Sequence, residues 1–358
     1  MQKSLYLPSL DGLRVLAFLM VLIHHMPTAE SSAALAKIHM YGWVGVELFF
    51  AISSFLFFHL LSAEKEKSGE INIGKFYIRR MLRIYPLMFL FTTSMLLFFG
   101  PSGDLYITRL IGNYLFIDNI ISWFNSYNSS IQYTSHLWTI SFEFQVYIII
   151  PFLFIIYCKI GKNNFIFFII FAFIYCLIMR ILIMRAGGYT VIWVTPIFRP
   201  ETILIGMTLS IFRPTWNIAY SFLALALSTS IFFNLSLPWI DLTGATFSYP
   251  VAAIMCGSLL DLAIRSSLVS KIFSLRPIRL VGIISFGMYV YHLLALSLSF
   301  KLVSQLSSTF DPSSNIQSWL VYFISAVTIC VMMAWASYHV IERPFLRLKG
   351  RFSIVEAR

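Results

Sequence analysis

The sequence predicts an all-α polytopic membrane protein with about ten transmembrane helices and both termini in the cytoplasm. Hydrophobic residues make up 59% of the 358 residues and charged residues only 11%, whereas soluble domains are about one quarter charged. Apolar stretches long enough to cross a bilayer, about 20 residues each, recur along the whole chain. Lysine and arginine gather in alternate connections between these stretches.

The apolar stretches give the predicted spans in order. They cover residues 8–28, 40–61, 84–100, 137–158, 165–184, 191–211, 218–237, 244–264, 280–300 and 316–341. The third span is short, and the break before the sixth rests on the turn-forming sequence RAGGY. The first span contains both acidic and basic side chains and no small-residue cleavage site follows it, so we expect a retained helix rather than a signal peptide.

The distribution of basic residues predicts the orientation. With the N-terminus inside, twenty of the 26 Lys and Arg residues lie on the inner side, five lie outside and Arg199 lies within a span. This bias is typical of cytoplasmic connections. It accounts for the formal net charge of +11 as topology, so we expect no nucleic acid partner.

The chain shows no linker that would divide it. We therefore expect one membrane domain over residues 1–345 and a short basic cytoplasmic tail over 346–358. The four cysteines all fall within apolar spans, and their spacing fits neither a disulfide framework nor a metal site.

Ionisable side chains within the spans are candidates for function, because each costs several kcal/mol unless it is paired or faces water. Arg14 and His25 in the first span are eleven residues apart. That spacing returns to nearly the same helix face with a rise of about 16 Å. Asp11 lies one turn before Arg14. The structural alternative is an arginine that extends to the interface and a histidine that caps the helix.

The outer halves of four predicted helices carry carboxylates and imidazoles. Glu47 and Glu143 lie at similar depth, and His136 precedes Glu143 by seven residues, on the same face if the helix extends that far. His292 is aligned with Tyr289. One such residue alone would be explained as a satisfied buried polar group. The convergent set predicts a cavity lined for acid/base chemistry.

The inner side carries a compact basic cluster. The stretch KFYIRRMLRIYP presents Arg79, Arg80 and Arg83 at helical spacing. Topology alone explains part of this cluster, but guanidinium groups stacked beside the membrane also bind phosphate well.

Two further patterns have structural interpretations. Arg199 and Glu201 lie mid-span, and we expect them to pair with partners inside the bundle. Glu342 stands beside Arg343, which predicts an ion pair that docks a helix terminus.

These segments resemble, in order, the acyltransferase family 3 of membrane proteins, which O-acetylate bacterial O-antigens, exopolysaccharides and nodulation factors. LDGLR, with Arg14 followed after ten residues by His25, is similar to the family's arginine–histidine signature. GVELFFAISSFL is similar to its GVDLFFVISGFL segment, and Arg80-x-x-Arg83 to its RxxR motif. HLWTISFEFQVY, SFGMYVYHLL and VIERPF resemble three further motifs, so the similarity covers about residues 5–345.

The chain departs from the family pattern at three positions. Ser54 replaces the usual glycine, which we attribute to packing, and Glu47 stands for the commoner aspartate. Phe144 replaces the second acid of a Glu–Glu pair, which leaves Glu143 as the only acid there. We expect none of the extracytoplasmic hydrolase-like domain that some relatives carry.

The resemblance implies a membrane-bound O-acyltransferase, most simply an O-acetyltransferase, in the bacterial inner (cytoplasmic) membrane. The donor would be acetyl-CoA or another acyl-CoA from the cytoplasm, and the acceptor a sugar hydroxyl of a lipid-linked, surface or exported glycan. Neither a permanently bound cofactor nor a metal is expected. Membrane lipids are the other expected partners.

The resemblance and the charge pattern together assign roles. His25 would be the general base or a transient acyl acceptor, two alternatives that stay open, with Glu143 or Glu47 to orient it. The donor would bind Arg14, Arg79, Arg80 and Arg83. Residues expected on the acceptor side or in the cavity lining are Asp11, His136, Trp138, Tyr289 and His292.

The alternative function is a proton-coupled secondary transporter of a small solute or glycan precursor. Such proteins also place carboxylates and histidines in the middle of the membrane. The chain shows no internal inverted repeat, and its basic cluster lies on the predicted cytoplasmic side. Both observations favour the enzyme.

Overall fold

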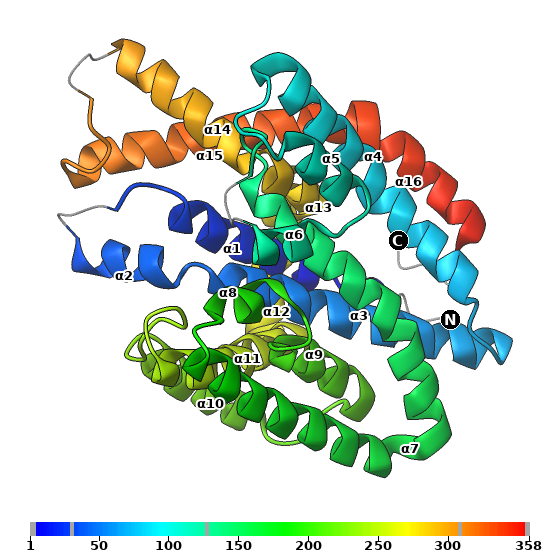
Figure 1. Cartoon of the computed structure of the whole chain (residues 1–358). Helices are drawn as coiled ribbons and strands as arrows, with labels where there is room; N and C mark the ends of the chain where they lie inside the picture. Colours follow the sequence, from blue (N-terminus) through cyan, green and yellow to red (C-terminus); the bar gives the residue numbers. More distant parts are fainter. Residues whose placement is uncertain (1–4, 29–31, 126–128, 307–309, 355–358) are drawn as a thin grey trace.

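The structure, a computed structural model, describes residues 5–28, 32–125, 129–306 and 310–354, which are almost entirely helical (Figure 1). Over these residues no strand is present, only an isolated bridge between Pro101 and Ile131. The all-α fold predicted from the sequence is confirmed.

Six helical stretches of the described chain are long and apolar enough to cross a membrane. They contain α3 (Val44–Ser68), α4 (Ile73–Phe99), α7 (Trp138–Arg185), α11 (Leu242–Arg265), α14 (Ser285–Leu306) and α15 (Ile316–Ser337). Two shorter apolar helices are α9 (Glu201–Phe212) and α10 (Ile218–Phe232). The chain is therefore a multi-pass membrane protein. The total of ten spans and the cytoplasmic termini stay predictions.

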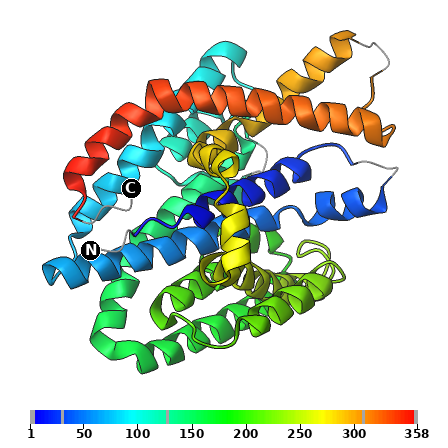
Figure 2. The same ribbon diagram turned by 180° about the vertical axis from the view of Figure 1, so that it is seen from behind.

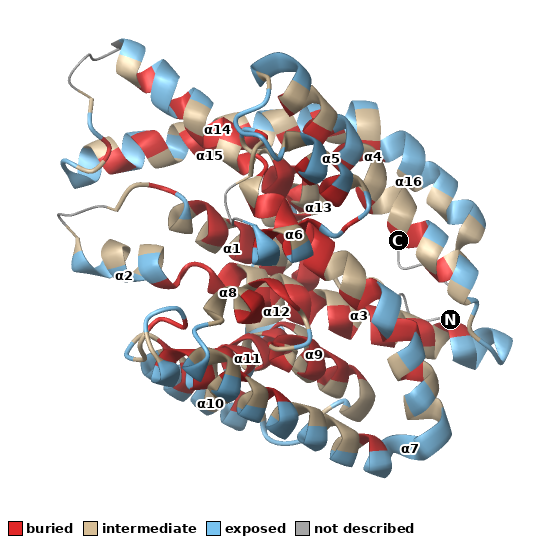
Figure 3. Cartoon of the chain, in the orientation of Figure 1, coloured by how far each residue is buried: buried red, intermediate tan, exposed pale blue. Residues whose placement is uncertain are grey.

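Two helices form the centre of the molecule. α1 (Pro8–His24) and α3 run side by side, with α4, α14 and α15 on one side of them and α9, α10 and α11 on the other (Figures 1 and 2). Residues coloured as buried gather along and around this pair, as Figure 3 shows. The outward face of α7 instead exposes large apolar side chains such as Phe167 and Phe171, each 69% exposed. Lipid is the solvent that suits such a face.

Local sequence signals place the basic cluster. Gly69 ends α3 in the left-handed region, with φ 79°, where a residue without Cβ carries no steric penalty. The Asn72 side chain then accepts a hydrogen bond from the backbone N–H of Lys75 and caps α4. α4 thus begins at Ile73 rather than at residue 84, and the basic cluster lies within its first turns.

The structure bears on two further predicted boundaries. Predicted spans 137–158 and 165–184 correspond to the two helical halves of α7, which are separated by a kink at Gly161, where φ is 79°. The single span 191–211 is wrong: a short helix, α8 (Tyr189–Val194), is followed by a non-helical segment before α9 begins. Pro196 and Pro200 lie in that segment, and proline cannot continue a helix from the residues before it.

The segment before α7 is folded onto the helices. It contains α5 (Tyr106–Tyr114) and α6 (Asp118–Phe124). The buried guanidinium of Arg109 donates to Asp118 Oδ1 at 3.0 Å. Phe116 stacks on Phe144 with ring centroids 4.0 Å apart. This stacking gives the departure from the family pattern at Phe144 a packing explanation.

Single cysteines introduced into a cysteine-free variant test the orientation. Asn125→Cys and Glu66→Cys replace exposed residues in the stretches predicted to lie outside and inside, respectively. We expect an impermeant thiol reagent added to intact cells to label position 125, and to label position 66 only after permeabilisation. The reverse pattern would invert the orientation that the positive charges predict.

Candidate functional site

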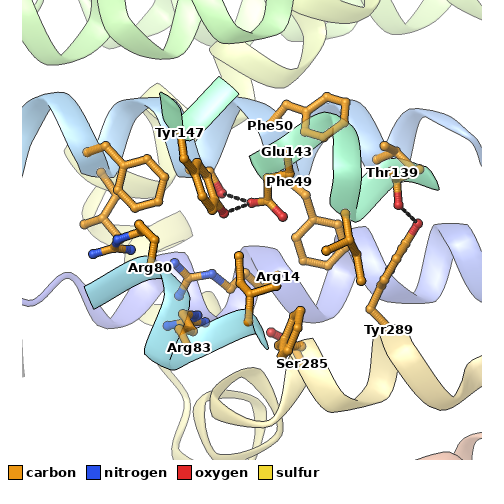
Figure 4. A pocket seen from close by; sticks show the side chains of 17 residues that line it. Arg14, Phe49, Phe50, Arg80, Arg83, Thr139, Glu143, Tyr147, Ser285 and Tyr289 are labelled. Atoms are coloured by element: carbon orange, nitrogen blue, oxygen red, sulfur yellow. Dashed lines mark hydrogen bonds between the residues drawn. The ribbon is translucent and has the colours of Figure 1, made fainter. Parts of the chain in front are cut away.

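A cavity of about 70 Å³ lies where α1, α3, α4, α7 and α14 meet (Figure 4). Basic, acidic and hydroxyl side chains share its lining with aromatic rings. The polar members are Arg14, Ser53, Arg80, Arg83, Thr139, Glu143, Tyr147, Ser285 and Tyr289. This volume is more than a single water molecule needs.

Three arginines form one end of the cavity. Arg80 is 5% exposed, and its guanidinium lies 4.3 Å from the ring centroid of Phe57. Over the described residues, neither Arg80 nor Arg83 makes a hydrogen bond or an ion pair. Arg14 is held by Asp11, whose Oδ1 accepts from Arg14 Nη1 at 2.7 Å. Guanidinium groups with unused donors in a partly desolvated site are suited to an anionic ligand.

Two residues predicted for binding have other positions. Arg79 donates to Glu64 Oε2 at 3.0 Å and to the Phe352 carbonyl at 2.8 Å, and it does not line the cavity. Asp11 was expected on the acceptor side or in the cavity lining. It does not line the cavity; it lies beside Arg14 and also accepts a hydrogen bond from the Tyr6 hydroxyl at 2.6 Å.

Glu143 lies between the arginines and the other end of the cavity (Figure 4). Its carboxylate accepts hydrogen bonds from Ser53 Oγ, at 2.8 Å, and from the Tyr147 hydroxyl. The sequence grouped Glu143 with the imidazoles, whereas the structure places it in the cavity that the arginines line. It forms no ion pair with any described arginine.

Tyr289 borders the other end of the cavity, and the histidines lie behind it; no described histidine lines the cavity itself. Tyr289 and Thr139 are joined there by a hydrogen bond of 2.5 Å between their hydroxyls (Figure 4). The ring of His136 packs against Tyr289 at 5.4 Å between centroids, and against His292 at 4.5 Å. His292 in turn contacts His25 at 4.9 Å. Three predicted imidazoles from different elements are thus brought together behind Tyr289, and we call them the histidine cluster.

Backbone carbonyls set the protonation pattern of the histidine cluster. Each ring has one nitrogen 2.6 to 3.2 Å from a carbonyl oxygen, so that nitrogen carries the proton and the other is a free acceptor. In His25 the donor is Nδ1, bonded to the Val21 carbonyl, which leaves Nε2 as the base. His25 is the exposed member, whereas His136 and His292 are buried. No described group of three His, Cys, Asp or Glu side chains is placed to hold a metal ion.

The neighbouring histidine has a different position. The Nδ1 of His24 lies 2.7 Å from the carbonyl oxygen of His39, and the Nδ1 of His39 lies 3.1 Å from that of Ile23. These reciprocal bonds fasten α1 to α2 (Ala33–Tyr41). The contacts of His24 are therefore those of a structural residue.

Glu47 is engaged elsewhere in the bundle. Its carboxylate accepts from Arg199 Nη1 at 2.8 Å and from Thr202 Oγ1 at 2.5 Å, and all three residues are buried. The expectation that Glu47 orients His25 has no support in this geometry. The expectation that Arg199 pairs within the bundle is confirmed.

The contacts around Arg199 bear on the predictions made for Glu201 and Trp138. Glu201 pairs with Arg180 at 2.5 Å, as expected for a partner inside the bundle. Trp138, predicted to line the cavity, instead packs against Arg199, with the guanidinium 5.3 Å from a ring centroid.

Glu342 is buried, Arg343 is exposed, and the ion pair predicted between them is absent among the described contacts.

A buried charge that loses its partner destabilises a protein by about 3–5 kcal/mol. We therefore expect Glu47→Gln, which leaves Arg199 unpaired, to lower the melting temperature of the purified protein markedly. Glu143→Gln is the matched control, since Glu143 takes part in no described ion pair, and it should melt near the wild type. A Glu47→Gln variant that melts normally but transfers no acyl group would restore Glu47 as a catalytic candidate.

Sequence reasoning missed two residues that hold Glu143. Tyr147 lies four residues after it on α7, and this i, i+4 spacing is a local signal for a contact. Ser53 approaches from α3, 90 positions earlier in the chain, and no local pattern indicates that contact.

Ser54, which replaces the usual glycine of the family pattern, packs against Gly206, where an added Cβ would lie 2.2 Å from the Ser54 hydroxyl.

Comparison with known proteins decides the family. A family model described as an acyltransferase domain matches residues 7–335, which is nearly the whole chain. The chain belongs to this acyltransferase family. The motifs that suggested it include Arg14, His25, Arg80 and Arg83, all within the matched range.

Curated relatives of the acyltransferase include two O-acetyltransferases. Peptidoglycan O-acetyltransferase OatA of Listeria monocytogenes is 26% identical over 328 residues, which cover 80% of this chain and 49% of the relative. O-acetyltransferase OatA of Staphylococcus aureus is 25% identical over 381 residues, covering 98% of this chain and 58% of the relative. The chain thus spans about half the length of the curated relatives it matches. No solved structure matches it significantly.

Proposed function

We propose that this acyltransferase moves an acyl group, most simply acetyl, from an acyl-CoA to a sugar hydroxyl of a surface or exported glycan. One observation supports the proposal above all. A cavity lined by three arginines, of which Arg80 and Arg83 form no described ion pair, adjoins through Tyr289 a cluster of histidines whose exposed member has a free ring nitrogen.

The arginine end suits the donor. Arg80 and Arg83 have donors to spare, and Asp11 holds Arg14 in place. Phosphate oxygens accept paired N–H bonds from such groups, which fixes the ligand as well as attracting it. The positive-inside count predicts that this end faces the cytoplasm, where acyl-CoA is available. The donor is then a substrate that enters and leaves, not a resident cofactor.

The histidine end suits the acceptor. The free Nε2 of His25 takes the proton from a sugar hydroxyl as the oxygen attacks the thioester carbonyl. A C–O bond forms, the C–S bond breaks, and the proton passes to the departing thiolate. If His25 instead accepts the acyl group first, the same nitrogen forms the acyl bond. Trapping of an acylated enzyme in the absence of acceptor separates the two routes.

The names of the relatives bear on the acceptor. The Listeria relative is named for peptidoglycan, a cell-wall glycan. For this chain we infer an acceptor in the same broad class, presented as a surface polymer or on a lipid carrier. The protein would lie in the cytoplasmic membrane of a bacterium, with His25 toward the outer side.

Turnover in proteoliposomes tests the proposal. Purified protein is given acetyl-CoA with a labelled acetyl group and an extract of surface glycans, and labelled ester and free thiol are measured. We expect both to appear in equal amounts. Uptake of a solute driven by a proton gradient, with no ester formed, would instead support the transporter alternative.

A further inference from the structure

The C-terminal end of the described chain covers the basic cluster. After α15 the backbone passes through a π-helical turn, Tyr338–Glu342, into α16 (Arg343–Lys349). α16 packs along α4, and both views show the two helices side by side (Figures 1 and 2). We call residues 343–354 the C-terminal strap. The strap lies beyond residue 335, where the family match ends.

Two bonds from basic side chains fasten the strap. Arg79 donates to the carbonyl of Phe352 at 2.8 Å, and its second bond, to Glu64, fixes the direction of its guanidinium. Lys67, near the end of α3, donates to the carbonyl of Ile354 at 2.8 Å. The strap is thereby held against the first turns of α4, at Arg79.

Lys349 has an unusual electrostatic environment. This half-buried residue of the strap lies within the electrostatic field of four arginines. The four are Arg14, Arg79, Arg80 and Arg83. Among the described residues its ammonium group makes no hydrogen bond or ion pair. Like charges brought together out of bulk water repel each other strongly, and a bound anion would relieve that repulsion.

The acids near this cluster are already engaged or face other groups. Glu64 is bonded to Arg79, and Glu143 accepts from Ser53 and Tyr147. The buried Glu342 interacts with Arg83 but forms no described ion pair. None of these carboxylates forms a described ion pair with Lys349.

We propose that the C-terminal strap forms one wall of the donor's phosphate site, with Lys349 as a direct phosphate ligand opposite Arg80 and Arg83. Several cations in one place call for a ligand with several negative charges. A nucleotide that carries more than one phosphate group, as CoA does, is such a ligand. The inference rests on the proposed donor and adds a binding residue from outside the matched family domain.

Binding of CoA, without any transfer, tests the inference on the full chain. Lys349→Gln removes the charge, Lys349→Arg keeps it, and Arg347→Gln removes an equal charge from an exposed position of the same helix. In phosphatidylcholine nanodiscs we expect Lys349→Gln to weaken CoA binding about tenfold. We expect Lys349→Arg and Arg347→Gln to bind within about threefold of the wild type.

Three outcomes would overturn the inference in distinguishable ways. If the wild type binds CoA and Lys349→Gln binds it equally well, the strap is no part of the phosphate site while the proposed donor stands. If the wild type binds no CoA, the proposed donor falls as well. Anionic lipid headgroups share the phosphate chemistry. If Lys349→Gln weakened CoA binding only in phosphatidylglycerol nanodiscs, and not in phosphatidylcholine nanodiscs, such a headgroup would be the ligand of Lys349.

Discussion

His25→Ala is expected to abolish acyl transfer, with a loss of about 10²-fold or more, whereas His24→Ala keeps most of the activity. The two neighbours share residue type, depth and helix propensity. Only His25 packs on His292 and leaves a ring nitrogen free at an exposed position. His24 bonds to the carbonyl of His39, so its loss should cost stability of about 1 kcal/mol rather than chemistry.

Ester formation from labelled acetyl-CoA measures both variants, and melting of the purified proteins shows that each is folded. Equal and mild effects would mean that both histidines merely anchor the end of α1. A folded His25→Ala variant with normal transfer, or an inactive His24→Ala variant, would show that the base has been placed on the wrong residue.

Arg80→Ala and Arg83→Ala are each expected to raise the donor KM about tenfold or more, because charge-assisted bonds to phosphate are lost. Lysine at either position should restore binding only in part, since a point charge cannot replace the planar fork. At position 80 a lysine would also lose the stacking on Phe57. Kinetics at varied acetyl-CoA and at saturating acceptor give the measurement.

Lys75→Ala supplies the control, because it removes a positive charge from the same helix at a position that does not line the cavity. Membrane insertion of all three variants should match the wild type. An unchanged donor KM in both arginine variants would assign Arg80 and Arg83 to topology alone.

The sequence predicted the two ends of the site because the membrane makes their charges expensive. Arg14, Arg80 and Arg83 on one side, and His25, His136 and His292 on the other, were each recognisable as groups that lipid would exclude. Depth along a span then separated the basic end from the imidazole end. What depth does not give is the direction in which a side chain faces within the bundle.

Glu47 and Glu143 show that limit. Both lie at similar depth in their helices, yet Glu47 faces Arg199, which is 152 positions away along the chain, and Glu143 faces the cavity. The pairing of Glu47 with Arg199 depends on how α3 and α9 pack together. No periodicity within a single helix indicates such a contact. The sequence alone therefore could not show that Glu47, rather than Glu143, lies away from the cavity.

The fold followed from hydropathy wherever the helices are long. The prediction from hydropathy failed between residues 191 and 211, where the composition remains apolar but Pro196 and Pro200 interrupt the helix. The start of α4 carried a readable signal, the Asn72 cap after Gly69, but hydropathy gives no weight to the polar first turns of a helix. The strap is likewise polar, and its contact with α4 is a matter of tertiary packing.

Proteoliposomes that contain the protein in one orientation test most directly the proposed transfer from the arginine end to His25. Labelled acetyl-CoA is supplied only on the side of the basic cluster, and a glycan acceptor only on the opposite side. We predict labelled ester on the acceptor in the opposite compartment, and none with folded His25→Ala protein. Ester that forms only when donor and acceptor share one compartment would contradict a site that spans the two faces of the membrane.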